Sequence, residues 1–340
     1  NKMKAAILEK IDAPLAVRDV ELTELKFGQV LVKVLVSGLC GAQLHEIRGH
    51  KGNAKFLPHL MGHEGCGIVE EVGLGVTTVK PGDKVVMHWR LGEGMEAPFP
   101  NYVLDGKTIS SGKVTTLSEY SIVSENRVTA IPDETPSVLA AMLGCSLTTA
   151  LGIIDNECDL KFGETVAIIG CGGVGLNLIQ AANMRSPLKV YGIDINKQMI
   201  DLSYIMGVTL FTESINDLEN NVDVIIDTTG IPQVIADAYN KLAPSGRLIL
   251  VGQPAPGKSV ELPNAVSMFD GTGKSVKATQ GGGTIPHVDI PRYIDLASRG
   301  IISYKQLHTD TFTLDEVNDA FDLLKSGSAG RIMIKIGEDV

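Results

Sequence analysis

The chain lacks an excess of basic residues and any long apolar run, and these two absences exclude whole classes of function. Its 340 residues carry a net charge of −10, whereas nucleic acid and anionic membrane surfaces require a positive surface on their partner. No stretch of about 18 uninterrupted apolar residues occurs, so we expect no membrane-spanning helix. The first ten residues also lack the apolar run of a signal peptide, and we expect no secretory leader.

Cysteine is sparse and scattered. The five cysteines are odd in number, at positions 40, 66, 145, 158 and 171. This pattern is typical of reduced thiols in a cytoplasmic protein rather than of a disulfide framework. Internal repeats and low-complexity tracts are absent as well. A chain of this length with 44% hydrophobic residues can form two domains and bury a large core without disulfides.

The first 130 residues are rich in strand signals. β-branched runs bounded by glycine occupy 29–39 and 65–73, and the Pro-Gly-Asp turn of "VKPGDKVVM" (79–87) precedes another strand. Glycine and proline at this density predict a compact, barrel-like antiparallel core.

Residues 147–280 instead alternate short apolar strands with helices, which predicts a parallel, doubly wound sheet and an α/β fold. After this region, Thr313 and Glu316 form a capping box for a helix that ends at Gly327. The predicted elements are strands at 164–170, 189–194, 222–230 and 246–252, helices at 172–184, 196–207, 232–243 and 313–327, and a closing strand at 330–336.

A glycine-rich turn between the first strand and helix of this region predicts a dinucleotide site. Gly170, Gly172 and Gly175 form the GxGxxG pattern in "GCGGVG". Such glycines permit a tight turn, close approach of a pyrophosphate and close packing of helix on sheet. Asp194 ends the next strand about 20 residues later, where a carboxylate accepts bonds from the ribose and repels a 2′-phosphate. We therefore expect NAD rather than NADP; the alternative is a structural turn with Asp194 as a helix cap.

Three residues from separate stretches suggest a metal site. His63 lies in "PHLMGHEGCG" (58–67), beside Glu64, while Cys40 and Cys145 lie elsewhere. A Cys₂His set leaves a fourth position open, which is the catalytic pattern for zinc. Spacing alone does not select these three, because a lone buried cysteine usually acts as a small hydrophobic residue.

The sequence resembles the zinc-containing alcohol dehydrogenases of the medium-chain dehydrogenase/reductase family. The matching segments run in family order across nearly the whole chain, and "GHEGCGIVEEVG" with "VKPGD" (62–83) is the most specific. The others are "GLCG" with "LH" (38–45), "GCSLTTALG" (144–152), "GCGGVG" (170–175), "GIDINK" (192–197), "DIPR" (289–292) and "DAFDLLKSG" (319–327).

The resemblance implies a GroES-like β-rich catalytic domain, at 1–146 and 280–340, and a Rossmann coenzyme domain at 147–279. It implies one catalytic zinc on Cys40, His63 and Cys145, with Glu64 beside it. The zinc polarises an alcohol oxygen while hydride passes to the nicotinamide. It also implies a homodimer or homotetramer joined through strands around 246–276.

The resemblance further assigns residues to the cofactor and to proton transfer. Arg331 matches the arginine that pairs with the cofactor pyrophosphate, and His45 matches the histidine that passes the proton to water. The implied NAD-binding set is Gly170, Gly172, Gly173, Val174, Gly175, Asp194 and Arg331.

Two residues beside Cys40 depart from the family pattern. Ala42 stands where the family has a serine or threonine hydroxyl, so the proton relay is broken or runs through water or a substrate hydroxyl. Alternatively, the change is simply tolerated. Gln43 stands where the family has an aspartate, and its amide oxygen can still accept the imidazole N–H of the histidine ligand.

The segment 89–116 departs as well, because it contains no cysteine. We expect no structural zinc there, and a long loop beside the substrate cleft. Trp89 falls where the family places an aromatic pocket wall. Arg48, Arg90 and this loop would suit a polar or sugar-derived alcohol, or they are simply solvated charges.

Two other functions stay open. One is a zinc-free quinone or enone reductase of the same family, which the complete ligand set argues against. The other is a non-catalytic NAD-binding protein, which Ala42 leaves possible.

Overall fold

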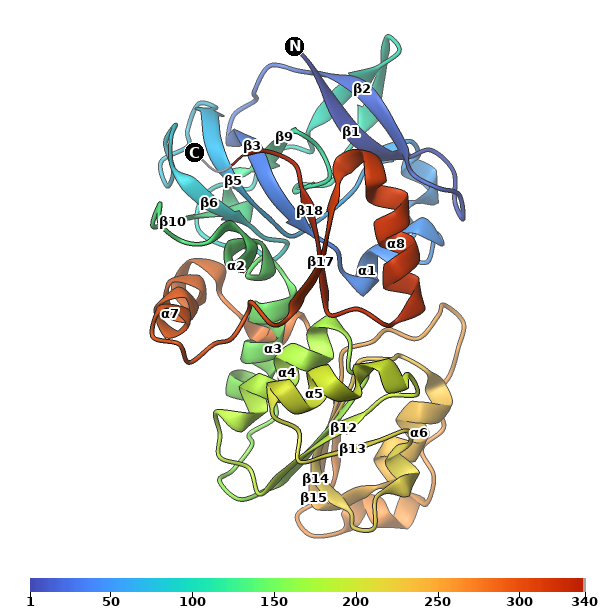
Figure 1. Ribbon diagram of the computed structural model, residues 1–340. Coiled ribbons are helices and arrows are strands. Elements are labelled where there is room, and N and C mark those ends of the chain that lie inside the picture. The colour runs from blue at the N-terminus through green and yellow to red at the C-terminus, as the bar shows by residue number, and fades with distance from the viewer. Residues whose placement is uncertain (339–340) are drawn as a thin grey trace. The chain divides into compact units, whose positions relative to one another are not determined.

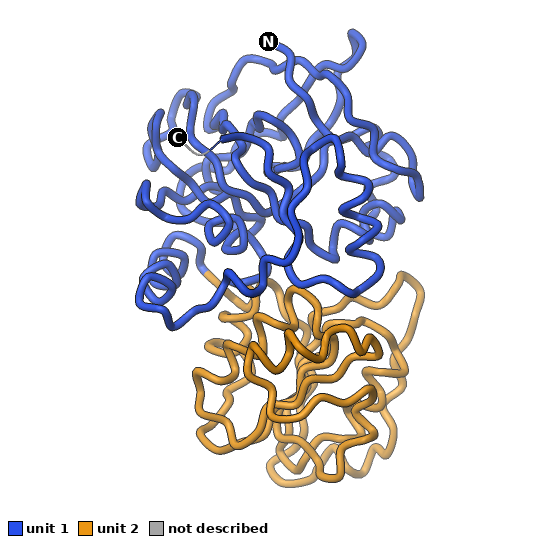
Figure 2. The backbone as a smooth tube through the Cα atoms, viewed as in Figure 1, with its two compact units in different colours: residues 1–148, 285–340 blue, residues 149–284 orange. Residues whose placement is uncertain are grey.

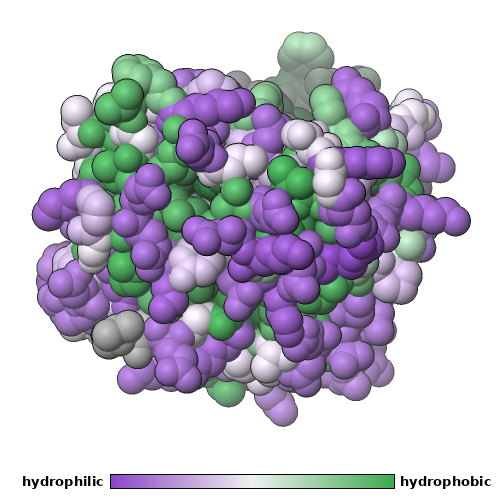
Figure 3. Space-filling model, turned by 90° about the horizontal axis from the view of Figure 1, so that it is seen from above, coloured by the Kyte–Doolittle hydropathy of each residue, from purple (hydrophilic) through white to green (hydrophobic). Residues whose placement is uncertain are grey.

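The computed structural model describes residues 1–338, and residues 339 and 340 lie outside the described part. The chain divides into two units, unit 1 with residues 1–148 and 285–340 and unit 2 with residues 149–284 (Figure 2). Within residues 1–338, no helix is long and apolar enough to cross a membrane. On the face shown in Figure 3, hydrophilic residues are interspersed with hydrophobic ones.

Five strands of unit 1 close into a barrel in the order β1-β2-β7-β8-β4 (Figure 1). On one face of β1, Met3, Ala5 and Ile7 are buried and pack with Tyr102 and Ile109. Side chains alternate between the two faces of a strand, and Ala6 and Leu8 on the other face are buried in a separate cluster. The barrel-like core predicted for this region is confirmed. The strands are β1 (Lys2–Leu8), β2 (Ala16–Leu22), β4 (His59–Leu60), β7 (Asn101–Leu104) and β8 (Lys107–Ser110).

A second sheet of unit 1 has the order β10-β6-β5-β3-β18-β17, and β9 also pairs with β3. The last strand of the chain, β18, lies beside β3, with Met333 opposite Gly38. This pairing brings Arg331 close to the end of β3, where Cys40 follows. The strands are β3 (Gln29–Gly38), β5 (Gly65–Val72), β6 (Lys84–Met87), β9 (Tyr120–Ser124), β10 (Val128–Ile131), β17 (His308–Thr313) and β18 (Arg331–Lys335).

The C-terminal helix α8 packs against α1 and β18. The predicted capping box is present, since the backbone N–H of Thr313 donates to Glu316 Oε1 at 2.9 Å. The first turn, η8 (Leu314–Glu316), is a 3₁₀ turn, and Gly327 ends the helix with a φ of 68°. The helices of unit 1 are α1 (Gly41–Ile47), α2 (Ser137–Met142), α7 (Pro286–Ser298) and α8 (Val317–Ser326), with 3₁₀ turns η1 (Asn53–Phe56) and η2 (Glu125–Arg127).

Unit 2 is built on a six-stranded sheet in the order β13-β12-β11-β14-β15-β16, in which every pair is parallel. Helix α4 contacts β11 and β12, and α6 contacts β14 and β15. The predicted parallel, doubly wound sheet is confirmed. The strands are β11 (Thr165–Ile169), β12 (Lys189–Ile193), β13 (Leu210–Thr212), β14 (Val222–Asp227), β15 (Leu242–Leu250) and β16 (Ser275–Ala278).

The helices of unit 2 are short, and the longest is α4, with 11 residues. Helix α3 (Ser146–Gly152) spans the boundary between the two units and continues into a π-helical turn, Ile153–Glu157. The others are α4 (Gly173–Asn183), α5 (Ile200–Met206) and α6 (Pro232–Asn240), with 3₁₀ turns at Lys197–Met199, Ile215–Asp217, Ala265–Phe269 and Gly281–Gly283.

Two expectations about the β-rich region were wrong. The segment 89–116 is not one long loop, because β7 and β8 form a hairpin within it. Asp105 and Gly106 make the turn, with φ of 51° and 76°, and the Asp-Gly pair is a known hairpin signal. The region is also not wholly antiparallel, because β4 pairs with β8 in parallel.

Candidate functional site

The structure brings together the three residues predicted as metal ligands. Cys40 follows β3, His63 lies between β4 and β5, and Cys145 lies between α2 and α3. One ligand atom from each lies within 4.8 Å of the others, and the two sulfur atoms are 4.0 Å apart. Two thiols and an imidazole form a donor set that zinc prefers, so these residues fit the metal that the sequence suggests.

Close backbone packing holds Cys145 in this position. At the preceding residue, Gly144, a Cβ atom would lie 2.4 Å from the carbonyl oxygen of Met87 and 2.7 Å from the Cα of Glu64. Any side chain there would push the segment away from β6 and from the residue after His63. Glycine at position 144 therefore allows Cys145 to approach His63 closely.

The pKa values of the cluster favour a thiolate. The hydrogen bond from Cys145 holds the pKa of Cys40 well below its usual value, against the effect of burial and with help from His63. Burial alone would lower the pKa of His63, but the charge of Cys40 and the charge of Glu46 raise it. Because metals bind the thiolate form of cysteine, the lowered pKa suits Cys40 to its predicted role as a metal ligand.

Gln43 acts on Cys40 rather than on the histidine. Its Oε1 accepts a hydrogen bond from the backbone N–H of Cys40 at 3.1 Å, which closes a capping box at the start of α1. Its Nε2 is buried and has no partner among residues 1–338. From the sequence we expected the Gln43 oxygen to accept from His63, but in the structure it accepts from the backbone of Cys40.

The carboxylate whose charge raises the pKa of His63 is Glu46, a residue that was not predicted from the sequence. Glu46 is half-buried on α1, and burial raises its own pKa. The available signal was its position about one helical turn after Gln43, on the same face of the helix. Glu46 therefore supplies the negative charge that the amide of Gln43 lacks.

Glu64 and Arg331 form an ion pair in the interior of unit 1. Their side chains are 0% and 3% exposed. Arg331 Nη1 also donates to the carbonyl oxygen of Leu39 at 2.7 Å, and the backbone N–H of Ser146 donates to Glu64 Oε2 at 3.1 Å. Burial lowers the pKa of Arg331 to about 10. The pair thus joins the segments that carry Cys40, His63 and Cys145.

Ala42 and His45 both lie on α1, close to Cys40 in the chain. The ring of His45 is half-buried and lies 5.9 Å, between centroids, from the ring of His50. Burial lowers the pKa of His45, and the nearby charges of Lys51 and Arg48 lower it further. His45 is therefore neutral near pH 7 and can accept a proton.

The glycine turn lies at the carboxyl end of β11 in unit 2. At Gly175 a Cβ would lie 1.7 Å from the carbonyl oxygen of Gly170, so only glycine allows α4 to pack this closely against the strand. A Cβ at Gly172 would meet nothing within 4 Å. Gly173 and Val174 form the first turn of α4 and are partly exposed. The turn therefore leaves space for a phosphate group at the start of a helix.

Asp194 fixes this turn from the end of β12. Its Oδ2 accepts from the backbone N–H of Cys171, and its Oδ1 from that of Asn196, each at 2.8 Å. Asp194 is not the helix cap that the alternative interpretation predicted, because Asn196 caps the following turn. Each carboxylate oxygen keeps a lone pair for a further donor.

Comparisons with known proteins match this chain in both unit 1 and unit 2. Two family models match consecutive parts of the chain: the alcohol dehydrogenase GroES-like domain at residues 26–133 and the zinc-binding dehydrogenase at residues 173–299. The S-(hydroxymethyl)glutathione dehydrogenase of Escherichia coli O139:H28 is 28% identical, covering 98% of this chain and 100% of its own length. The chain belongs to the zinc-containing alcohol dehydrogenase family.

Solved structures of other dehydrogenases share the fold. The 2R,3R-butanediol dehydrogenase of Bacillus subtilis aligns with a TM-score of 0.78 at 25% identity, over 98% of this chain and 99% of its own. The benzyl alcohol dehydrogenase of Acinetobacter calcoaceticus aligns with a TM-score of 0.88 at 22% identity, over 99% and 100%. These likenesses extend over both units.

In this member of the family, hydrogen bonds hold part of the segment 89–116, in which we expected no structural zinc. Glu125 Oε1 accepts from the backbone N–H of Met95 at 2.8 Å, and its Oε2 accepts from the backbones of Thr77 and Thr78, both at 2.9 Å. Ser124 Oγ accepts from the backbone N–H of Ala97 at 2.8 Å. A buried carboxylate and a hydroxyl thus anchor residues 95–97.

Replacing Glu125 by glutamine should destabilise this chain by about 2 kcal/mol, because the amide nitrogen cannot accept the bonds that a carboxylate oxygen accepts. Burial raises the pKa of Glu125, but bonds from Thr78, Met95 and Thr77 lower it more, and the net shift is downward. A lowered pKa means that the charged form stabilises the fold above the unfolded pKa of about 4.3, and that this stabilisation is lost as the pH falls further.

Urea unfolding at pH 7 and at pH 3.5 measures this effect. The matched control is Glu93→Gln, an exposed residue of the same segment, which should leave stability unchanged. A Glu125→Gln variant as stable as the wild type at pH 7 would contradict the anchoring role.

Proposed function

We propose that the chain is a zinc-dependent, NAD-linked alcohol dehydrogenase. The observation that carries the proposal is the convergence of Cys40, His63 and Cys145, with ligand atoms within 4.8 Å, in a chain of this family. These three residues would hold one zinc ion and leave one coordination position open for substrate. Bound zinc would act as a Lewis acid on the oxygen of an alcohol or carbonyl substrate.

The residues around the cluster would position the ligands and move the proton. Gln43 holds the backbone of Cys40, and the Glu64–Arg331 pair ties the segments of the cluster together. His45, with its lowered pKa, would accept the proton that leaves the alcohol. Because Ala42 offers no hydroxyl, we infer that a water molecule or a second substrate hydroxyl completes the path between the substrate and His45.

Unit 1 would be the catalytic domain and unit 2 the coenzyme domain, and the boundaries at 146/147 and 279/280 stay predictions. In unit 2, the turn with Gly170, Gly172, Gly173, Val174 and Gly175 would receive the pyrophosphate. Asp194 would accept hydrogen bonds from the adenosine ribose. Arg331 has its partners within unit 1, and its contact with the pyrophosphate stays a prediction.

Replacing Asp194 by asparagine should lower the preference for NADH over NADPH by about tenfold or more, because the negative charge that repels a 2′-phosphate is removed. Titration of the purified protein with each reduced cofactor, followed by cofactor fluorescence, measures the ratio of dissociation constants without a known substrate. The control is Asp201→Asn on the exposed face of α5. An unchanged ratio in the Asp194 variant would place cofactor selection elsewhere.

Elemental analysis of freshly purified protein tests the function most directly. We expect about one zinc per chain, because residues 1–338 offer one three-ligand site and no cysteine lies in 89–116. A panel of alcohols with NAD then tests turnover. Absence of zinc after growth in zinc would favour the zinc-free reductase. Turnover that appears only in an Ala42→Ser variant would favour a non-catalytic NAD-binding protein.

We also propose that two copies associate through the free edge of β16. All four residues of β16 are exposed, including Val276, at 39%, and Val266 and Phe269 in the preceding 3₁₀ turn expose 79% and 83% of their surface. An exposed strand edge beside apolar side chains favours pairing with a second copy. The molar mass in solution, compared with 36.2 kDa for one chain, distinguishes a monomer from a dimer or tetramer. A cytoplasmic location stays a prediction from the unpaired cysteines.

A further inference from the structure

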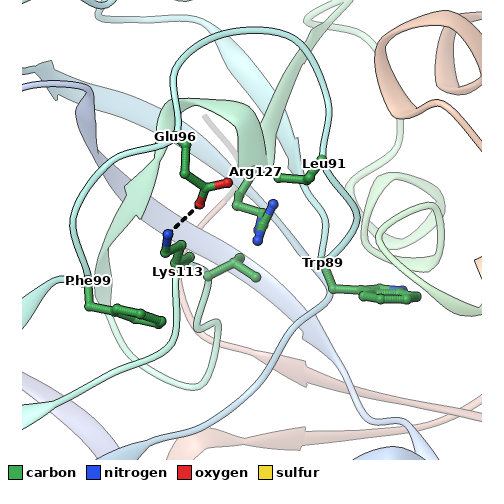
Figure 4. A pocket seen from close by; sticks show the side chains of 7 residues that line it. Trp89, Leu91, Glu96, Phe99, Lys113 and Arg127 are labelled. Carbon is green, nitrogen blue, oxygen red and sulfur yellow. Dashed lines mark ion pairs between the residues drawn. The ribbon is translucent and has the colours of Figure 1, made fainter. Parts of the chain in front are cut away.

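A pocket of about 450 Å³ lies in unit 1, and its lining includes none of the three predicted metal ligands. It is bordered by the segment after β6, by the residues before β9 and by η2. Its volume falls within the range of small-molecule sites. The lining is apolar at Trp89, Leu91, Phe99 and Val114, and charged at Glu96, Lys113 and Arg127 (Figure 4).

Two of the three charged residues satisfy each other. Lys113 Nζ lies 2.6 Å from Glu96 Oε1 and 4.8 Å from the ring centroid of Phe99. Glu96 Oε2 accepts from Asn126 Nδ2 at 3.2 Å. The hydrogen bond from Lys113 lowers the pKa of Glu96, against the effect of burial. The pair is therefore neutral as a whole, and the lining keeps one net positive charge, on Arg127.

Arg127 has no partner for part of its guanidinium. Its Nη1 is buried and makes no hydrogen bond within residues 1–338. Burial lowers its pKa, although the charge of Glu96 acts in the other direction. In Figure 4 the guanidinium extends into the space between Glu96 and Trp89. A buried charged donor without an acceptor is costly, and a bound anion would supply the acceptor.

We propose that this pocket binds a small organic carboxylate with an apolar body. The carboxylate would accept hydrogen bonds from Arg127, because the planar guanidinium matches both oxygens of a carboxylate. The apolar body would lie against Trp89, Leu91 and Phe99, which supply the aromatic and aliphatic surface. None of the seven lining residues is a predicted zinc or NAD ligand, so binding requires neither zinc nor NAD. Trp89, which the resemblance to the family places in the wall of the substrate pocket, is the residue that the two sites share.

The chain offers a direct probe of this pocket, because Trp89 is its single tryptophan. We would titrate the protein with 3-phenylpropanoate and with the neutral 3-phenylpropanamide, and follow tryptophan emission. The carboxylate should give a saturable change, with an affinity at least about tenfold higher than the amide, because only the carboxylate can pair with the charge of Arg127. Equal affinities for the two compounds, or no saturable change, would overturn the proposal.

Variants locate the interaction. Arg127→Gln should weaken binding of the carboxylate by about tenfold or more. Arg90→Gln is the matched control, because Arg90 also lies near Trp89, 5.8 Å from its ring centroid, but is not in the lining. It should keep the affinity within about twofold. If Arg127→Gln does not fold, Arg127→Lys serves instead, since it keeps the charge and loses the planar fork. Unchanged affinity in the Arg127 variant would overturn the proposal.

One further variant separates this proposal from the proposed zinc chemistry. Cys145→Ser, outside the pocket, should bind 3-phenylpropanoate as the wild type does. Loss of binding in Cys145→Ser would show that the carboxylate binds at the cluster rather than at Arg127.

Discussion

Replacing Cys145 by serine should remove zinc from the purified protein and lower alcohol turnover by about a thousandfold or more. A serine hydroxyl is a poor zinc ligand, and the remaining Cys40 and His63 do not complete a three-ligand site. A metal acting as a Lewis acid contributes several kcal/mol to the transition state, and each 1.36 kcal/mol changes the rate tenfold. Zinc per chain and kcat/KM with NAD are the two measurements.

Cys158→Ser is the matched control. Cys158 is buried like Cys40 but lies in unit 2, outside the cluster, where burial raises its pKa to about 11. This variant should keep its zinc and its turnover. If Cys145→Ser kept one zinc per chain, or if both variants lost it, the assignment of Cys145 as a ligand would be wrong.

Replacing Arg331 by methionine should lower the free energy of unfolding by about 3–5 kcal/mol. The change leaves Glu64 as a charged group without its partner, in a position with 0% exposure. It also removes the bond to the carbonyl oxygen of Leu39. Denaturant unfolding, monitored by circular dichroism, measures the loss.

The double variant Glu64→Gln/Arg331→Met tests the cause. If the cost comes from an unpaired charge, the double variant should recover a large part of the stability lost in Arg331→Met. Additive losses would instead show that Glu64 and Arg331 stabilise the fold independently. This readout does not depend on zinc binding or on activity, so it reports on the ion pair itself.

The sequence predicts the fold well where local patterns decide the structure. The glycine-bounded runs 29–39 and 65–73 form β3 and β5, and the alternation of strands and helices forms the parallel sheet of unit 2. The hairpin of β7 and β8 was missed although Asp105 and Gly106 carry its signal, because polar residues and glycine around it suggested a loop. Composition describes the average of a segment, whereas a two-residue turn fixes its backbone.

The site was harder to derive, because its contacts join residues far apart in the chain. Cys40, His63 and Cys145 share no spacing that selects them, and the resemblance to the family supplied the set. The pairing of Glu64 with Arg331 depends on β18 lying beside β3, a long-range arrangement that periodicity does not encode. The bond from Gln43 to the imidazole of His63 was expected by analogy with the aspartate of the family. Glutamine has one more methylene group than aspartate, and its amide reaches the backbone of Cys40 instead.

The bonds of Ser124 and Glu125 to residues 95–97 have a consequence for the response of this protein to chelators and oxidants. Peroxide attacks thiolates and a chelator strips metal from them, but neither reagent reacts with a carboxylate bonded to backbone amides. The bonds that anchor residues 95–97 therefore do not depend on a bound metal or on a thiolate, so a chelator should leave this segment in place.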